Sequence, residues 1–160
     1  MSYTNSDGLH VLTHGGQGVV QDKGVTEEGS SFLVMDIADF TAIGSSFGSA
    51  NIDPNDAVLP AGAVILGATL VMTTAATSGG SATLTIGTYN AAGTAIDADG
   101  IDATVGVAAL GASAVVRCDG AQAAGVGGYL SAAAHIGIIY GTAVFTAGAG
   151  KLIVEFKKVA

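Results

Sequence analysis

Basic side chains are the scarcest feature of this 160-residue sequence. Lys and Arg number five against 13 Asp and Glu, which gives a formal net charge of −8. Binding to nucleic-acid phosphates requires clustered Lys and Arg that displace counterions. Only two of the five basic residues are adjacent, so we expect no nucleic-acid partner. The five are Lys23, Arg117, Lys151, Lys157 and Lys158.

Disulfides, a signal peptide and a long apolar run are also missing. Cys118 is the single cysteine, so no intrachain disulfide can form. The opening residues MSYTNSDG lack the basic and then apolar pattern of a signal peptide. The longest apolar stretch, 57–72, is interrupted by Pro60, Gly62 and Gly67 and falls short of about 18 uninterrupted apolar residues. We therefore expect cytoplasmic synthesis without classical export, and no membrane partner.

Tryptophan is absent and aromatic residues make up only 6% of the chain, yet hydrophobic residues reach 49%. The apolar content is carried by small or slim side chains (Ala, Val, Ile and Leu), which suit a thin core between closely packed layers. Charged residues make up only 11%, and the mean hydropathy is +0.57. Exposed apolar surface on a free monomer favours association. The composition therefore predicts an oligomer that hides uncharged surface in subunit contacts.

Two regions differ in pattern, and we expect them to be an N-terminal arm over 1–30 and a β-sandwich domain over 31–160. Residues 1–30 are polar and rich in glycine, whereas alternation with period two begins at Ser31. The strands are too closely spaced for βαβ units. Seven or eight strands with glycine turns predict one mostly β, antiparallel sandwich. The alternation places strands near 31–37, 63–74, 82–87, 115–117, 130–138, 142–146 and 151–157, with turns at 78–80 and 147–150.

One short helix is expected near 99–110, after a loop over 90–100. Ile101, Val105 and Ala108 recur at helical spacing, and Asp99 and Asp102 are placed to cap the first turn. The helix would be the single α element of the sandwich.

A serine motif resembles the nucleophile site of a hydrolase. Residues 44–48 (GSSFG) match G-x-S-x-G around Ser46, and acids and His135 follow downstream. That motif works only between a strand and a helix of an α/β-hydrolase sheet. Here the pattern after Gly48 indicates a loop, so we favour a flexible loop of small residues.

An aspartate pattern and a pair of histidines each resemble a metal site, but neither is complete. An EF-hand loop starting at Asp97 would place Asp102 where glycine is needed and Ala108 where glutamate is needed. His10 and His14 are four residues apart, but no third ligand is in view. We expect neither to bind a metal, and we expect a structural or interface role for His135.

Residues 148–151 (GAGK) resemble the end of a P-loop. The full motif fails because Phe145 stands in place of the first glycine and Leu152 in place of Ser or Thr. The segment is predicted to be a β-turn. We therefore expect no catalytic, cofactor-binding or metal-binding residues, no cofactor and no enzymatic activity.

With these segments laid out, the chain resembles capsid decoration (cement) proteins of tailed bacteriophages over residues 57–157. The resemblance implies a jelly-roll-like sandwich, often trimeric, on the outer face of a capsid, bridging major capsid subunits. Its partners would be the major capsid protein and copies of itself, as a homotrimer, on a virion assembled in the host cytoplasm. The matching patterns are Leu59–Ile65 (LPAGAVI), Gly80–Gly87 (GSATLTIG), Ala95–Ala103 (AIDADGIDA) and Phe145–Glu155 (FTAGAGKLIVE).

The alternative from another class is a head or tail fibre or spike domain that binds a host surface glycan. Glycan sites usually offer exposed aromatic side chains. The four tyrosines do not cluster in the sequence, which favours the capsid role. They are Tyr3, Tyr89, Tyr129 and Tyr140.

Overall fold

The computed structural model describes residues 2–4, 10–12, 31–51 and 57–159. Strands β1 (Ser2–Thr4) and β2 (His10–Leu12) pair antiparallel, with Ser2 opposite Leu12. The rest of the expected arm over 1–30 lies outside the described residues. The division into an arm and a domain therefore stays a prediction.

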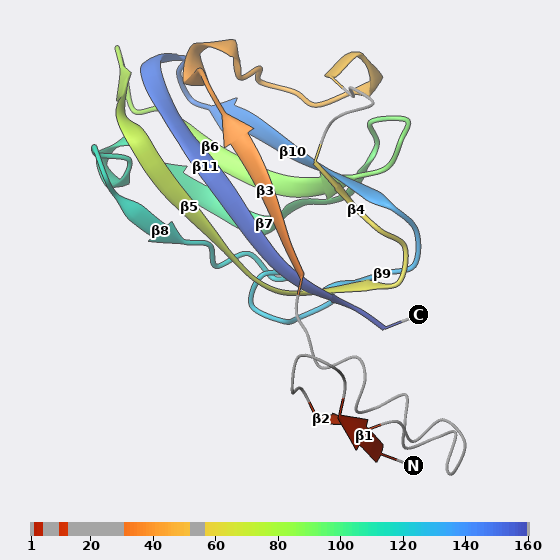
Figure 1. Ribbon diagram of the computed structural model, residues 1–160. Helices are drawn as coiled ribbons and strands as arrows, with labels where there is room; N and C mark the ends of the chain where they lie inside the picture. The colour runs from red at the N-terminus through yellow and green to blue at the C-terminus, as the bar shows by residue number, and fades with distance from the viewer. Residues whose placement is uncertain (1, 5–9, 13–30, 52–56, 160) are drawn as a thin grey trace.

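Two antiparallel sheets form the body of the molecule (Figure 1). The first has the order β3-β11-β5-β8, and the short β9 also pairs with β5. The second has the order β4-β10-β6-β7. The strands of the first sheet are β3 (Ser31–Ile37), β5 (Ala63–Ser78), β8 (Val115–Arg117), β9 (Tyr129–Leu130) and β11 (Phe145–Lys158). Those of the second are β4 (Val58–Leu59), β6 (Thr83–Tyr89), β7 (Ala95–Gly106) and β10 (Ala134–Gly141).

The connectivity is that of a jelly roll. Without the short β9, the strands from β3 to β11 can be numbered one to eight in chain order. In that numbering the first sheet has the order 1-8-3-6, and the second has the order 2-7-4-5. Two such four-stranded sheets make up the eight-stranded jelly-roll sandwich. The expected mostly β sandwich of jelly-roll type is confirmed.

The core lies between the two sheets and follows from the alternation of each strand. Leu70 on β5 and Leu152 on β11 point inward from the first sheet, and Leu84 and Ile136 do so from the second. All four are at most 1% exposed. Each such side chain stabilises the fold by about 1.5–3 kcal/mol when buried.

An aromatic pair closes one end of this core. Phe40 begins the 3-10 helix η1 (Phe40–Ala42), and its ring meets that of Phe145 edge-on, with centroids 5.4 Å apart. Asp39 caps η1 by accepting hydrogen bonds from the Thr41 N–H and hydroxyl, each at 2.8 Å. These bonds lower the pKa of the Asp39 carboxyl. A polar cap therefore holds a fully buried ring in place.

The helix expected over 99–110 is wrong, because these residues continue strand β7 to Gly106 and end in the 3-10 turn η3 (Val107–Ala109). A spacing of four residues, as between Ile101 and Val105, also puts both side chains on one face of a strand, and both are buried there. Asp102 caps no helix, since its Oδ1 accepts from the Thr104 N–H within the strand. The described residues contain no α-helix, and so none that could cross a membrane.

The turn expected over 147–150 and the separate strand expected over 142–146 are also wrong. The chain turns between β10 and β11 at 142–144, and residues 145–150 lie inside β11. The pairing of β11 with β5 shifts register three times between Phe145 and Gly150. Gly148 has a φ of 140°, and a Cβ there would lie 3.0 Å from the Phe40 ring. Glycine here allows bulges and close packing over Phe40 rather than a reversal of the chain.

Candidate functional site

Ser46 does not have the surroundings of a hydrolase nucleophile. Ser46 lies in the loop between η1 and η2 (Ser49–Asn51), with neither a strand directly before it nor an α-helix after it. It lines a hollow of about 350 Å³ together with Asp36, Asp39 and Ile138, and no histidine lines that hollow. The expected loop is confirmed for residues 44–48, whereas residues 49–51 form η2 and residues 52–56 lie outside the described part.

The aspartates of the calcium-like pattern are divided between surface and interior. Asp99 is exposed, whereas Asp102 is 3% exposed and accepts a hydrogen bond from the Cys118 thiol. Burial, and then the neighbouring Asp119 carboxylate, raises the pKa of Asp102. Burial and a hydrogen bond with Asp99 raise the pKa of Asp97. Within the described ranges, no three His, Cys, Asp or Glu side chains converge to hold a metal ion.

Of the three histidines, His135 is the one whose side chain the structure describes. His14 and the side chain of His10 lie outside the described residues. His135 is on β10, opposite Tyr89 on β6, and its buried Nδ1 has no hydrogen-bond partner among the described residues. The Tyr89 ring packs at a tilt against that of Phe47, with centroids 4.4 Å apart, and Tyr89 is 4% exposed, so it offers no open platform for a sugar.

The outward side of the first sheet carries large apolar side chains. Phe32, Val34 and Val115 are 62%, 56% and 67% exposed. Residues paired across antiparallel strands share one side of a sheet. Val34, Ile153, Thr69 and Arg117 therefore form one row from β3 to β8. We name this surface the β11 face; it comprises Phe32, Val34, Asp36, Val64, Gly67, Thr69, Val71, Val115, Arg117, Tyr129, Lys151, Ile153, Glu155 and Lys157.

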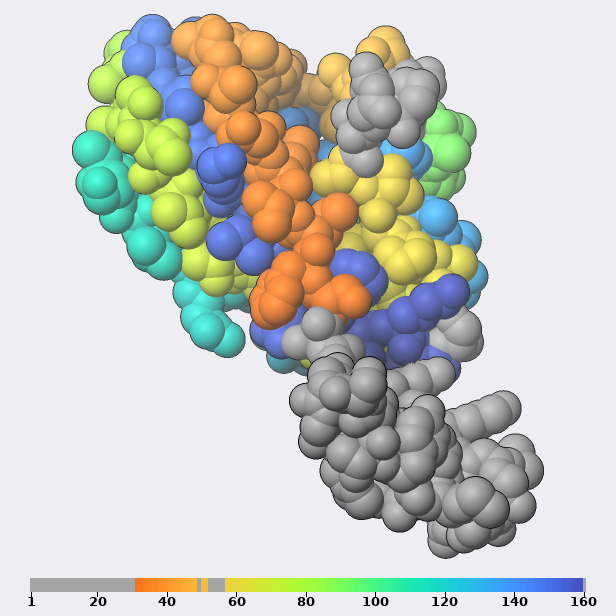
Figure 2. Space-filling model, in the orientation of Figure 1, coloured from red at the N-terminus to blue at the C-terminus, as the bar shows by residue number. Residues whose placement is uncertain are grey.

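Figure 2 shows this sheet from its outward side, with β8, β5, β11 and β3 next to one another in teal, lime, blue and orange. The strand β3 forms the edge, because it pairs with β11 alone among the described strands. It is apolar on both sides, with Leu33 and Met35 partly buried against the core. An exposed apolar edge strand tends to pair or aggregate unless something covers it.

The two sheets also differ in charge. The first contains four basic and two acidic residues, a formal charge of +2, and the second contains three aspartates and no Lys or Arg, a formal charge of −3. Every Lys or Arg of the described part lies on β8 or β11. Lys151 and Asp36 form an exposed ion pair at 3.6 Å, which contributes little stability. In a chain of net charge −8, the β11 face thus combines exposed apolar side chains with three of the four Lys and Arg residues of the described part.

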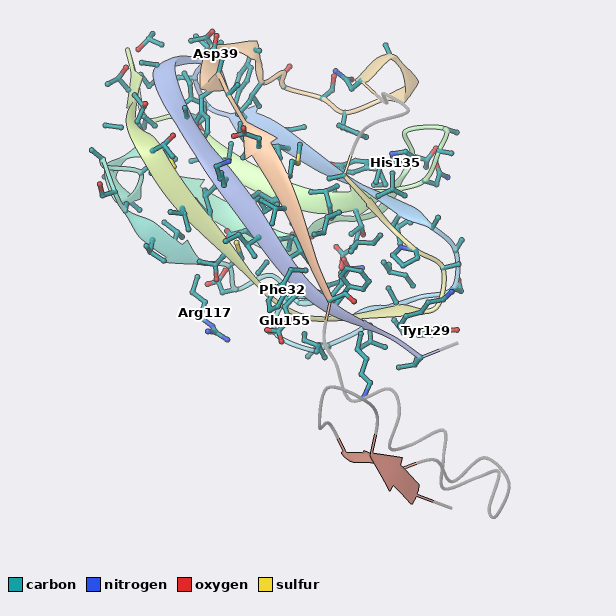
Figure 3. All side chains as sticks on the ribbon, in the orientation of Figure 1. Phe32, Asp39, Arg117, Tyr129, His135 and Glu155 are labelled. Carbon is teal, nitrogen blue, oxygen red and sulfur yellow. The ribbon has the colours of Figure 1, made fainter. Side chains whose placement is uncertain are left out.

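A small recess of about 80 Å³ interrupts the β11 face at Gly67. Gly67 is opposite Glu155, and the β11 pairing skips Leu66, so a bulge places the glycine here. Figure 3 shows Phe32 and Glu155 close to each other and Arg117 extending from the β8 side. The recess is lined by Phe32, Gly67, Ala68, Thr69, Arg117, Ile153 and Glu155.

Sequence reasoning missed this surface as a site. It predicted a strand over 31–37, but it treated Gly67 only as a break in an apolar run. The available signal was a strand over 31–37 that is apolar on both sides, which is unusual for an edge. The recess needs the register of β3, β11, β5 and β8 together, and no local pattern contains that register.

The fold is thus a jelly-roll sandwich, and its β11 face is apolar and carries a net positive charge. A chain of the capsid of Ralstonia phage GP4 is similar in structure. The two align with a TM-score of 0.49 over 82% of this chain and 84% of that chain, at 17% sequence identity. No protein-family model matches the sequence, and no curated protein matches it. The function has to be inferred from the surface of this chain itself.

Proposed function

We propose that this chain is a structural protein of a phage virion that binds the outer surface of the capsid and stabilises contacts between major capsid subunits. The observation that carries the proposal is the β11 face. It presents apolar side chains from β3, β11 and β8 together with the positive charge of an otherwise acidic chain.

Contiguous apolar surface distinguishes this face from the scattered exposed side chains of an ordinary protein. Single exposed apolar residues need no explanation, but apolar side chains spread over four neighbouring strands mark an interaction surface. Phe32 and Val34 lie on the edge strand, so a partner that covers them would also shield the strand from non-specific pairing. A protein surface is therefore a better partner than a small molecule.

The resemblance of residues 57–157 to decoration proteins supports a capsid as that surface. Jelly-roll sandwiches occur in viral capsid proteins but also in lectins and cupins, so the fold alone does not decide the function. In this proposal the subunits form homotrimers, and residues 1–30 act as an arm that adds backbone hydrogen bonds to a neighbour. Repeating a modest contact over a symmetric lattice gives avidity without tight binding by each copy. The protein has no enzymatic role.

Capsids that lack the protein provide the direct test. Purified protein mixed with such capsids should bind to a fixed stoichiometry in sedimentation assays and raise the temperature at which the capsids release their contents. Sedimentation equilibrium of the free protein tests the trimer. The absence of wild-type binding would refute the capsid proposal.

A pair of valine variants tests whether the β11 face makes the contact. Val34 on that face is 56% exposed and Val144, between β10 and β11, is 54% exposed. Val34→Glu buries a charge in the proposed contact and should lower capsid affinity at least tenfold, whereas Val144→Glu should bind as wild type does. Equal binding by the two variants would exclude the β11 face.

A further inference from the structure

The recess at Gly67 has the size and position of a missing side chain. A Cβ built on Gly67 would meet only the Arg117 Nη2, at 3.9 Å, which is ordinary contact. Gly67 is not in the left-handed region, so its backbone accepts any residue. Glycine in a strand interior weakens the strand. A Cβ would fit here without strain, and glycine in a strand can mark a place where another molecule approaches closely.

Opposite charges stand on the two sides of the recess without forming a pair. Glu155 on β11 is directly opposite Gly67, and Arg117 on β8 is opposite Thr69. Among the described residues, the ion pair between Lys151 and Asp36 is the one found within 4.0 Å, so Glu155 and Arg117 remain apart. Phe32 and Ile153 complete the wall with apolar surface.

We propose that this recess receives the side-chain amide of an Asn or Gln from the protein that covers the β11 face. The amide N–H₂ donates to the Glu155 carboxylate, and the amide oxygen accepts from the Arg117 guanidinium. This inference rests on the proposed docking of that face and adds the chemistry that the partner presents. A side chain fits better than a main-chain peptide, because the recess lies one side chain deep in the middle of the sheet.

Other groups satisfy the recess less well. A carboxylate would pair with Arg117 but would be repelled by Glu155, and an ammonium group would meet the reverse problem. An apolar side chain would strip water from both charges and leave them unpaired, which is costly. A neutral amide is both donor and acceptor and therefore satisfies both charges at once.

Filling the recess is the first test. Gly67→Val places a β-branched side chain in it, and Gly106→Val is the matched control on β7, where a Cβ would meet nothing within 4 Å. Both variants should melt at or above the wild-type temperature, since valine suits a strand better than glycine. Gly67→Val should bind capsids at least tenfold more weakly than wild type, and Gly106→Val should bind normally.

Removing each charge separately is the second test. Whether capsid affinity rises or falls in each variant distinguishes an anionic, a cationic and a neutral occupant of the recess. Arg117→Gln and Glu155→Gln should each weaken binding by about three- to tenfold, since hydrogen bonds to charged groups are the stronger ones. Lys157→Gln and Asp36→Asn control for removing one positive or negative charge elsewhere on the same face, and should change affinity less than either.

The outcomes separate this inference from the proposed function. If wild type fails to bind capsids, both are overturned. If wild type binds and Gly67→Val binds equally well, the recess is not used and the inference alone fails. Tighter binding by Glu155→Gln would mean an anionic occupant and tighter binding by Arg117→Gln a cationic one, and either result would overturn the amide.

Discussion

Cys118 should make the stability of this protein fall steeply at alkaline pH. The thiol is 5% exposed and donates a hydrogen bond to the buried Asp102 carboxylate. Burial first, and then the Asp102 charge, raises the pKa of Cys118 from its ordinary value of 9.0 to about 12. The folded state therefore keeps the proton over a range in which the unfolded chain has lost it.

The sign and size of the effect follow from proton linkage. A raised thiol pKa gives stability that is complete below pH 9 and is lost as the pH rises toward 12. At pH 10.5 the loss is about 2 kcal/mol, since each pH unit between the two values costs about 1.4 kcal/mol. That is a large part of the roughly 5–15 kcal/mol by which a small domain is stable.

Urea unfolding at pH 8.0, 9.5 and 10.5 measures this directly. Cys118→Ser keeps a hydroxyl donor for Asp102 but does not titrate in this range. Between pH 8.0 and 10.5, its free energy of unfolding should therefore fall by about 2 kcal/mol less than that of the wild-type protein. Tyr89, whose pKa is raised chiefly by burial, titrates in both proteins and cancels in the comparison. Parallel pH profiles for the two proteins would refute the raised pKa of the Cys118 thiol.

Three further perturbations test the packing. Gly87→Ala should destabilise by about 3 kcal/mol in denaturant unfolding, because its Cβ would overlap the Ala98 carbonyl oxygen, whereas Gly106→Ala, at an open position, should stabilise slightly. Phe40→Ala should cost about 3–5 kcal/mol in the same assay, since the ring is fully buried; a smaller loss would mean that the core end collapses around it. Asp102→Asn should raise stability at pH 7, because a buried carboxylate with a raised pKa loses stability as the pH rises through that value. Its advantage over wild type should shrink as the pH falls and Asp102 takes up a proton; an advantage that stays constant would contradict the proposed cause.

Period-two alternation was sufficient to predict most of the strands. The strand expected over 31–37 has the bounds of β3, and Leu152 and Val154 are buried on β11 as the pattern indicates. The errors at 99–110 and at 147–150 have a common cause. A spacing of four residues and a run of glycines each fit two structures, and pairing with a neighbouring strand decided between them at Ile101 and Gly148.

The candidate site was less accessible to sequence reasoning. The apolar outward side of residues 31–37 could be recognised in the sequence. Its neighbours on the β11 face come from distant strands, however, and Phe32 is opposite Glu155, 123 residues further along the chain. Which glycine among 25 leaves an open recess depends on the bulge that skips Leu66. Sequence patterns are local, and this surface is built from non-local pairing.

The position of β11 between β3 and β5 has a consequence for the order of events during synthesis. β3 is made early, yet its partner is the last strand of the sandwich, with Ser31 opposite Phe156. Such long sequence separations slow folding. On the ribosome, Phe32 and Val34 remain without the strand that supports them until residues 145–158 emerge. The β11 face, and with it any ability to dock, would then appear in one late step rather than on a partly made chain.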